Sequence, residues 1–247
     1  MEWREVNGVR WLESELGNAH AAFSTRAGGV SEGDFASLNL GVLTDDGESK
    51  VRENRARLST ALQIDPDRVL IGRQVHAADV LLHEGPQEPA PWSTASADPP
   101  AVDGHATAAR GLAALVFVAD CLPIALAGTN GVAMVHGGWR GLAGGIVGRG
   151  AEAVGATDAA IGPGIGPCCY EVGEEVLATF APLGPRFADG RMLDLPAIAR
   201  ALLERAGVER IDESGLCTRC NQDIFFSHRG SGGRTGRQAG LVWRNVD

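Results

Sequence analysis

The segment over residues 112–136 constrains the fold most strongly, because a short polar turn separates two apolar runs. Gly128-Thr-Asn-Gly131 has the residues of a β-hairpin turn. The first apolar run is interrupted by Asp120 and Pro123 and falls short of the ~20 residues that a membrane-spanning helix needs. The segment therefore predicts two apolar antiparallel strands rather than a membrane helix.

The predicted hairpin brings a cysteine close to a histidine. If its loop pairs Ala127 with Val132, Pro123 lies opposite His136. Cys121 and His136 then lie diagonally on one face with Cα atoms roughly 7–8 Å apart, whereas a slip of one residue would place them on opposite faces. In the first register the two side chains can reach one metal ion, or the imidazole can activate the thiol.

The rest of the chain mixes helical and strand patterns without regular βαβ repetition. Helical periodicity predicts helices over residues 48–62, 142–154, 174–180 and 196–206. Apolar segments predict strands over residues 21–25, 69–75, 112–119, 123–127, 132–136, 159–161 and 239–242. We therefore expect a mixed α+β fold with one continuous core.

Composition excludes several classes of protein. The 247 residues carry a net charge of −9 and are 44% hydrophobic, which is typical of a globular protein and not of a disordered or fibrous one. The acidic balance disfavours a broad surface for nucleic acid or anionic membranes, although a local basic pocket is compatible with it. The N-terminus lacks the apolar core of a signal peptide, so we expect a cytoplasmic protein whose five cysteines are reduced.

Two irregular stretches predict loops. Residues 84–100 contain five prolines among small polar residues, which disfavours regular pairing and predicts an exposed loop. Residues 229–237 are rich in glycine and arginine, and the preferred interpretation is an exposed turn.

Eight short motifs occur in order along the chain. They are Ser24-Thr-Arg-Ala-Gly-Gly-Val-Ser-Glu-Gly, Ser37-Leu-Asn-Leu-Gly41, Glu53-Asn-Arg55, Gln74-Val-His76, Ala119-Asp-Cys-Leu-Pro123, Val135-His-Gly-Gly-Trp-Arg-Gly-Leu142, Ile161-Gly-Pro-Gly-Ile-Gly-Pro-Cys-Cys-Tyr-Glu-Val172 and Cys217-Thr-Arg-Cys220. Together they resemble the bacterial YfiH/YlmD family, also called the laccase-domain or polyphenol-oxidase family, whose mammalian relative is FAMIN. The resemblance spans residues 21–243 and implies a single YfiH-like α+β domain over residues 1–247, with mixed β-sheets flanked by helices.

The resemblance also implies a metal site formed by His76, Cys121 and His136. One cysteine and two histidines with a vacant fourth position are the pattern of a catalytic zinc site. Copper is the alternative, because it also accepts thiolate and imidazole ligands. Gly137 stands where the family usually has alanine, and we expect it to loosen the loop without removing the ligand.

The activities that the resemblance implies concern purine nucleosides. They are phosphorolysis of adenosine, inosine, guanosine and methylthioadenosine, together with deamination of adenosine. A single open zinc site suits deamination, because the metal lowers the pKa of water to about 7. A multicopper laccase needs more histidine ligands than six scattered histidines easily supply, so a copper-dependent polyphenol oxidase is the weaker alternative.

Further candidate site residues lie beside the expected metal ligands or within the motifs. Asp120 is a candidate proton shuttle, and an equal alternative is that it only orients a ligating histidine. The candidates for binding phosphate, ribose or base are Arg26, Asn39, Arg55, Gln74 and Arg140. Arginine suits phosphate because its guanidinium makes bidentate charge-assisted hydrogen bonds, and Arg140 is the strongest candidate because it follows His136 in a glycine-rich loop.

Three other interpretations stay open. The family has a link to editing of cell-wall precursors, in which Cys121 and His136 would act as a thiol hydrolase. The domain could instead be a non-catalytic module that binds a metal or a partner. Cys217 and Cys220, with His228 and either Cys168 or Cys169, could form a structural zinc site, but reduced thiols packed near the pocket are favoured because one Cys-x-x-Cys is a weak signal.

Overall fold

The structure is a computed structural model that describes residues 1–94 and 98–246, and its main feature is two six-stranded sheets. In spatial order the first sheet contains β1 (Glu2–Val6), β2 (Val9–Leu16), β3 (Ala19–Ser24), β14 (Gln238–Trp243), β7 (Ala113–Val118) and β4 (Val69–Leu70). The second contains β13 (Arg210–Glu213), β10 (Ala156–Ile161), β8 (Leu122–Gly128), β9 (Gly131–Gly137), β6 (Gly104–Thr107) and β5 (Val80–His83). Both sheets are mixed, because β4 pairs with β7 and β5 with β6 in parallel.

Helices and short turns complete the fold. The α-helices are α1 (Glu48–Leu62), α2 (Trp139–Ala143), α3 (Ile146–Val154), α4 (Glu174–Phe180) and α5 (Leu195–Arg205). A small hairpin joins β11 (Ala188–Asp189) to β12 (Met192–Leu193), and 3-10 turns lie at Gly33–Phe35, Pro66–Arg68, Ala181–Leu183 and Pro185–Phe187. None of the described helices is both long and apolar enough to cross a membrane.

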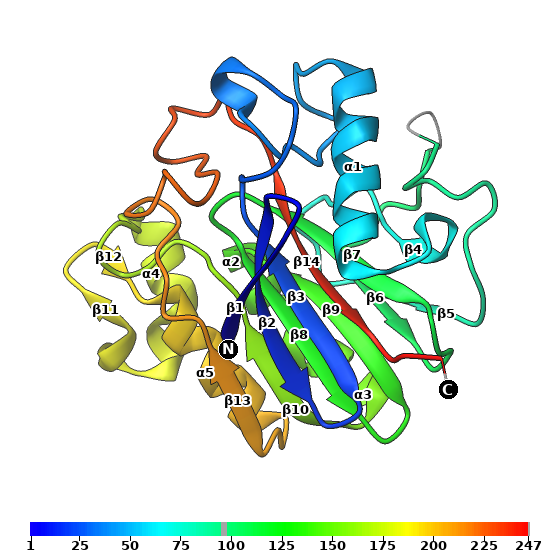
Figure 1. Ribbon diagram of the computed structural model, residues 1–247. Helices are drawn as coiled ribbons and strands as arrows, with labels where there is room; N and C mark the ends of the chain where they lie inside the picture. Colours follow the sequence, from blue (N-terminus) through cyan, green and yellow to red (C-terminus); the bar gives the residue numbers. More distant parts are fainter. Residues whose placement is uncertain (95–97, 247) are drawn as a thin grey trace.

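The two sheets stack face to face around a shared apolar layer (Figure 1). Phe23 and Val242 of the first sheet belong to the same buried cluster as Ala125, Met134 and Ala160 of the second. Small residues in the second sheet leave room for the larger side chains opposite, so the sheets can interdigitate closely. This central layer joins the two sheets, which confirms the predicted α+β class, but the expected single continuous core is divided into this layer and one cluster on each outer face.

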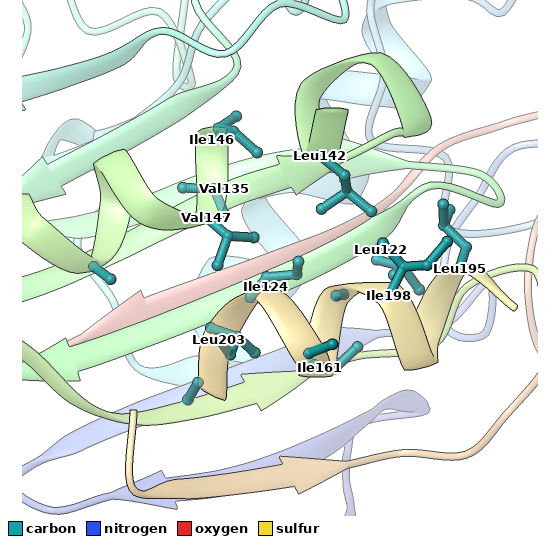
Figure 2. Close-up of a cluster of buried hydrophobic side chains, with 14 of the residues drawn as sticks. Leu122, Ile124, Val135, Leu142, Ile146, Val147, Ile161, Leu195, Ile198 and Leu203 are labelled. Atoms are coloured by element: carbon teal, nitrogen blue, oxygen red, sulfur yellow. The ribbon is translucent and has the colours of Figure 1, made fainter. Parts of the chain in front are cut away.

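Helices cover the two outer faces. Helix α1 packs on the first sheet, where Leu58 contacts a cluster that includes Trp11 and Leu241. The second sheet is covered by α2, α3 and α5, whose buried residues meet Ile124 and Val135 of β8 and β9 (Figure 2). The hairpin of β8 and β9 is therefore buried on both faces, which explains why its strands are almost continuously apolar.

The hairpin has the predicted register. Ala127 pairs with Val132 and Pro123 with His136. Gly137 lies in β9 opposite Leu122, so it belongs to a strand and the expectation of a looser loop there is wrong. The fixed register is what carries Cys121 and His136 to the same end of the second sheet.

Other predicted elements need correction. The helix expected over residues 142–154 is broken into α2 and α3 at Gly144 and Gly145, where Gly145 adopts a φ of +87°. The strand expected over residues 69–75 ends at Leu70, because the amide of Ile71 donates to the side chain of Gln87 instead of to a strand.

The loop predicted over residues 84–100 has no helix or strand among its described residues, but it is not wholly exposed. Trp92 is buried, stacks on Phe117 and donates its indole N–H to Ser59. Residues 95–97 of this prediction lie outside the described residues. The proline-rich segment is therefore anchored against helix α1 and can contribute to a pocket wall.

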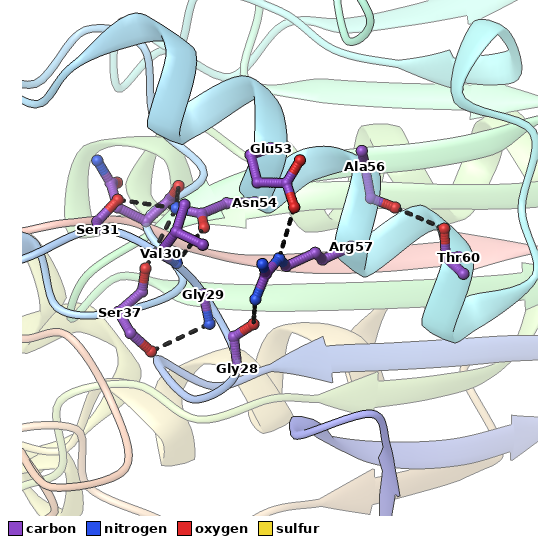
Figure 3. A network of polar contacts seen from close by, with 11 residues as sticks. Gly28, Gly29, Val30, Ser31, Ser37, Glu53, Asn54, Ala56, Arg57 and Thr60 are labelled. Carbon is purple, nitrogen blue, oxygen red and sulfur yellow. Dashed lines mark hydrogen bonds and ion pairs between the residues drawn. The ribbon is translucent and has the colours of Figure 1, made fainter.

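Asn54 of helix α1 braces the segment before it (Figure 3). Its amide nitrogen donates to Ser31 Oγ and to the carbonyls of Ser37 and Asn39, while its oxygen accepts from the amide of Val30. Buried polar groups that lose their partners cost about 1–3 kcal/mol each. Asn54 is therefore a structural residue.

Asn54→Ala is expected to lower the free energy of unfolding by about 2–4 kcal/mol, because several buried groups lose their partners together. Urea unfolding followed by circular dichroism measures this loss. The matched control is Thr60→Ala on the same helix, because Thr60 is exposed and its hydroxyl donates to the carbonyl of Ala56 within the helix. Equal stability of the two variants would contradict the bracing role.

Candidate active site

Three side chains from separate segments converge at one end of the second sheet. His76 lies in the connection between β4 and β5, Cys121 in the turn between β7 and β8, and His136 near the end of β9. One ligand atom of each lies within 4.8 Å of the other two. His136 is buried, Cys121 is half-buried and His76 is exposed, so the cluster faces solvent on one side.

Asp103, directly before β6, holds two of these residues in place. Its carboxylate lies 2.8 Å from His136 Nδ1, and it accepts hydrogen bonds from the amides of Val75, His76 and Ala77 at 2.8–3.0 Å. His76 has a φ of +60°, a conformation that non-glycine residues adopt at a cost. The three amide bonds fix that conformation, and the bond to Nδ1 leaves Nε2 of His136 free to face Cys121.

The surroundings of Cys121 and His136 favour a thiolate beside an imidazolium, with the proton on the histidine. Burial opposes ionisation of Cys121, but the charge of His136 and hydrogen bonds from both histidines outweigh it and lower the pKa of the thiol to about 6. Burial also opposes the charged form of His136, but Cys121 and Asp103 raise the pKa of the imidazole to about 9. A thiolate is the form that binds metals and acts as a nucleophile.

The cluster fits a metal ion. A Cβ atom at Gly138 would lie 3.2 Å from Cys121 Sγ and 3.3 Å from His76 Cδ2, so glycine lets the chain pass close to the donors without displacing them. One thiolate and two imidazoles, one of them oriented by a carboxylate, are a suitable donor set for zinc or copper. Cys121, His76 and His136 would hold the ion.

Asp120 lies beside the cluster but orients neither histidine. Its Oδ1 accepts from Thr218 Oγ1 at 2.6 Å and its Oδ2 from the amide of Arg229 at 2.7 Å. The carboxylate that contacts His136 is Asp103, so the alternative that Asp120 orients a ligand histidine is wrong. Asp120 instead ties the turn that carries Cys121 to residues 218–229.

The donor cluster opens into a cavity of about 490 Å³. All three donors line it, together with the aromatic side chains of Phe117 and Tyr170. Four arginines and two aspartates also line it: Arg55, Arg73, Arg229, Arg237, Asp98 and Asp120. The arginines outnumber the aspartates, so the lining of the cavity favours an anionic ligand although the protein as a whole is acidic.

Arg55 is the most unusual of the four arginines. Its side chain is buried, and it donates to the carbonyls of Leu40, Pro91 and Trp92. Nη2 has no hydrogen-bond partner among the described residues. Burial lowers the pKa of the guanidinium to about 10, so it remains charged at neutral pH. Nη2 is itself buried, so an anion in the cavity would have to reach it through this wall to supply the missing partner.

Three of the predicted substrate-binding residues do not line the cavity. Arg140 is exposed and stacks over Trp139. Arg26 donates to the carbonyls of Ala36 and Gln222, and Asn39 is buried among bonds to the turn over residues 41–46. Arg26 and Asn39 brace loops, because their donors already have partners inside the protein.

Gln74 does line the cavity, but its side chain amide is paired on both sides with the backbone of Phe117, at 2.7 and 2.8 Å. The structure therefore brings together His76, Cys121, Asp120, His136, Arg55 and Gln74 of the predicted set. It leaves Arg26, Asn39 and Arg140 outside.

Sequence reasoning missed Arg237 and Arg229. The stretch over residues 229–237, expected to be an exposed turn, forms one wall of the cavity. Burial lowers the pKa of Arg237, opposed by the negative groups of Cys121 and Asp120. The sequence did hold a signal for these residues. Several arginines occur close together in an otherwise acidic chain, between glycines that would let the backbone approach a ligand closely.

Comparison with known proteins shows which family the chain belongs to. Residues 20–245 match the sequence model of the family described as multi-copper polyphenol oxidoreductase laccase. The Geobacillus stearothermophilus protein named purine nucleoside phosphorylase YlmD is 36% identical over 256 residues, which cover 93% of this chain and 91% of that protein. The Escherichia coli protein named purine nucleoside phosphorylase YfiH is 34% identical, covering 98% of this chain and 96% of that protein.

The crystal structure of YlmD from Geobacillus stearothermophilus has the same fold. It aligns with a TM-score of 0.87 and 33% sequence identity, and the alignment covers 98% of both chains. The match of sequence and fold is what the resemblance predicted. The chain belongs to the YlmD/YfiH family, the laccase-domain family of multi-copper polyphenol oxidoreductase type.

Proposed function

We propose that this protein is a zinc-dependent purine nucleoside phosphorylase that also deaminates adenosine. The observation that carries the proposal is that the donor cluster of His76, Cys121 and His136 opens into the same cavity as four arginines. The names of the relatives support phosphorolysis of a purine nucleoside. Adenosine, inosine, guanosine and methylthioadenosine are the proposed substrates.

Phosphorolysis needs an anion held beside the ribose. An oxygen of phosphate attacks C1′ of the ribose, the bond from C1′ to N9 breaks, and the purine leaves with the electron pair of that bond. Arg55 and Arg237 can hold the phosphate through charge-assisted hydrogen bonds. Phe117 and Tyr170 offer aromatic surface for the base.

Deamination uses the donor-cluster end of the cavity. Water adds at C6 of adenosine and ammonia leaves, which requires a group that takes a proton from water and delivers one to the leaving nitrogen. Asp120 lines the cavity and is the proposed shuttle, with its carboxylate positioned by Thr218 and Arg229. Zinc, when bound, supplies a Lewis acid that lowers the pKa of water.

The experiment is a chromatographic assay of zinc-loaded protein with adenosine or inosine. In phosphate buffer we expect free purine base to accumulate, and in phosphate-free buffer we expect adenosine to yield inosine. Cys121→Ala supplies the background, because it removes one metal donor. Base release that does not depend on phosphate, or equal turnover by the Cys121→Ala variant, would contradict the proposal.

Metal removal separates zinc chemistry from a thiol hydrolase. We expect chelation to lower turnover at least tenfold and added zinc to restore it, because His76, Cys121 and His136 act as ligands. A thiol nucleophile at Cys121 would instead stay active without metal. Nucleoside turnover and zinc content are measured in the same samples. Activity restored by copper alone, with phosphate-independent oxygen uptake, would favour the polyphenol oxidase.

A further inference from the structure

A second cluster of metal-binding side chains lies outside the cluster of His76, Cys121 and His136. It consists of the four remaining cysteines, Cys168, Cys169, Cys217 and Cys220, whose Sγ atoms all lie within 4.8 Å of one another. The first two follow β10 in the segment over residues 162–170, and the other two lie about fifty residues further along the chain. The fold thus supplies the partner pair that one Cys-x-x-Cys motif lacks.

The sulfur positions suit a tetrahedral thiolate site. Cys220 Sγ lies 3.5 Å from Cys168 Sγ and 3.4 Å from Cys169 Sγ. Four sulfurs at the Zn–S distance of 2.3 Å stand roughly 3.8 Å apart, so small shifts would close the site around an ion. A disulfide needs sulfurs about 2.05 Å apart, so neither of these two pairs is bonded, and all four cysteines are free.

Backbone amides stabilise a thiolate at Cys217. The amide of Gly166 donates to its Sγ at 3.3 Å, and the amide of Cys220 also donates to it. A Cβ at residue 166 would lie 3.3 Å from Cys217 Cβ and 3.5 Å from Cys168 Sγ, so the glycine lets the backbone approach the sulfurs closely.

The cluster connects two segments that form the cavity. Ile165 and Tyr170 line the cavity beside Cys168 and Cys169, and His228 and Arg229 line it beyond Cys220. Thr218, next to Cys217, donates to Asp120. An ion held by all four sulfurs would therefore fix one cavity wall to the other.

We propose that Cys168, Cys169, Cys217 and Cys220 bind a second zinc ion as a closed, structural tetrathiolate site. Binding displaces the thiol protons and forms four Zn–S bonds, with no vacant position for substrate. Because the site supports the cavity wall and not the chemistry, it is independent of the reaction proposed above.

The test counts zinc in protein purified under reducing conditions without chelators. We expect two zinc ions per chain by plasma mass spectrometry, one after Cys121→Ala and one after Cys217→Ser/Cys220→Ser. Cobalt substitution of the Cys121→Ala variant should give the intense near-ultraviolet absorption of thiolate-bound cobalt. A zinc content of the Cys217→Ser/Cys220→Ser variant equal to that of the wild type would overturn the proposal, whereas loss of zinc only from the Cys121→Ala variant would concern the other cluster.

Two variants of an exposed ligand guard against an effect of misfolding. Cys220 is exposed, so Cys220→Ala and Cys220→His should both fold. Histidine is itself a zinc ligand, so we expect Cys220→His to keep the second zinc and Cys220→Ala to lose it, with a lower thermal midpoint. Equal zinc content in the two folded variants would mean that these thiols only pack against one another.

Discussion

Asp103→Asn is expected to lower the affinity of the active-site cluster for zinc and nucleoside turnover by about a hundredfold. Removing a carboxylate that orients a metal ligand costs about 10–100-fold. The upper end applies here because Asp103 holds both His136 and the backbone of His76. Asparagine has one acceptor oxygen, and its NH₂ group would face amide donors, so the positive φ of His76 would lose its support.

The matched control for this prediction is Asp79→Asn. Asp79 is exposed and forms a surface ion pair with Arg149 at 3.0 Å, so the same loss of charge should leave zinc content and turnover unchanged. Zinc titration with a competing chelator measures the affinity, and gel filtration first selects folded protein. Asp103→Asn protein that kept wild-type affinity would show that the histidines are positioned without the carboxylate.

Local patterns in the sequence were sufficient for the central hairpin but not for its surroundings. The register of β8 and β9 follows from a short turn between two apolar runs, so both strands could be placed. The exposed strand β1 and its partner β2 were missed, although Asn7 and Gly8, with φ of +52° and +80°, are a hairpin-turn pair. The insertion of β14 between β3 and β7 depends on pairs more than two hundred residues apart in sequence with β3 and more than a hundred apart with β7.

The candidate active site was likewise predictable only where its residues are close together in sequence. The hairpin brought Cys121 and His136 together from the residues alone, whereas His76 entered only through the family resemblance. Asp103 was missed because no spacing motif links it to His136, 33 residues away in sequence. Long-range packing also decides which arginines line the cavity. Arg140 was expected there because it is close to His136 in sequence, but it does not line the cavity.

Arg55→Met is expected to raise the KM for phosphate at least tenfold, with a smaller effect on the KM for nucleoside. A hydrogen bond to a charged group contributes about 1.5–3 kcal/mol, and each 1.4 kcal/mol is a factor of about ten in affinity. Arg140→Met is the matched control, because Arg140 is exposed and outside the cavity. We expect it to leave both KM values unchanged.

A thermal shift separates phosphate binding by Arg55 from its role in packing. Arg55→Met also removes the donors for the carbonyls of Leu40, Pro91 and Trp92, so the variant should unfold at a lower temperature whatever its ligand. Phosphate that binds the folded state raises the unfolding midpoint. We expect inorganic phosphate to stabilise the wild type and Arg140→Met, but not Arg55→Met. Equal stabilisation of all three proteins would show that Arg55 does not bind the phosphate. Arg237 or Arg229 would then be the expected ligand, because these cavity arginines lie beside the donor cluster and Asp120.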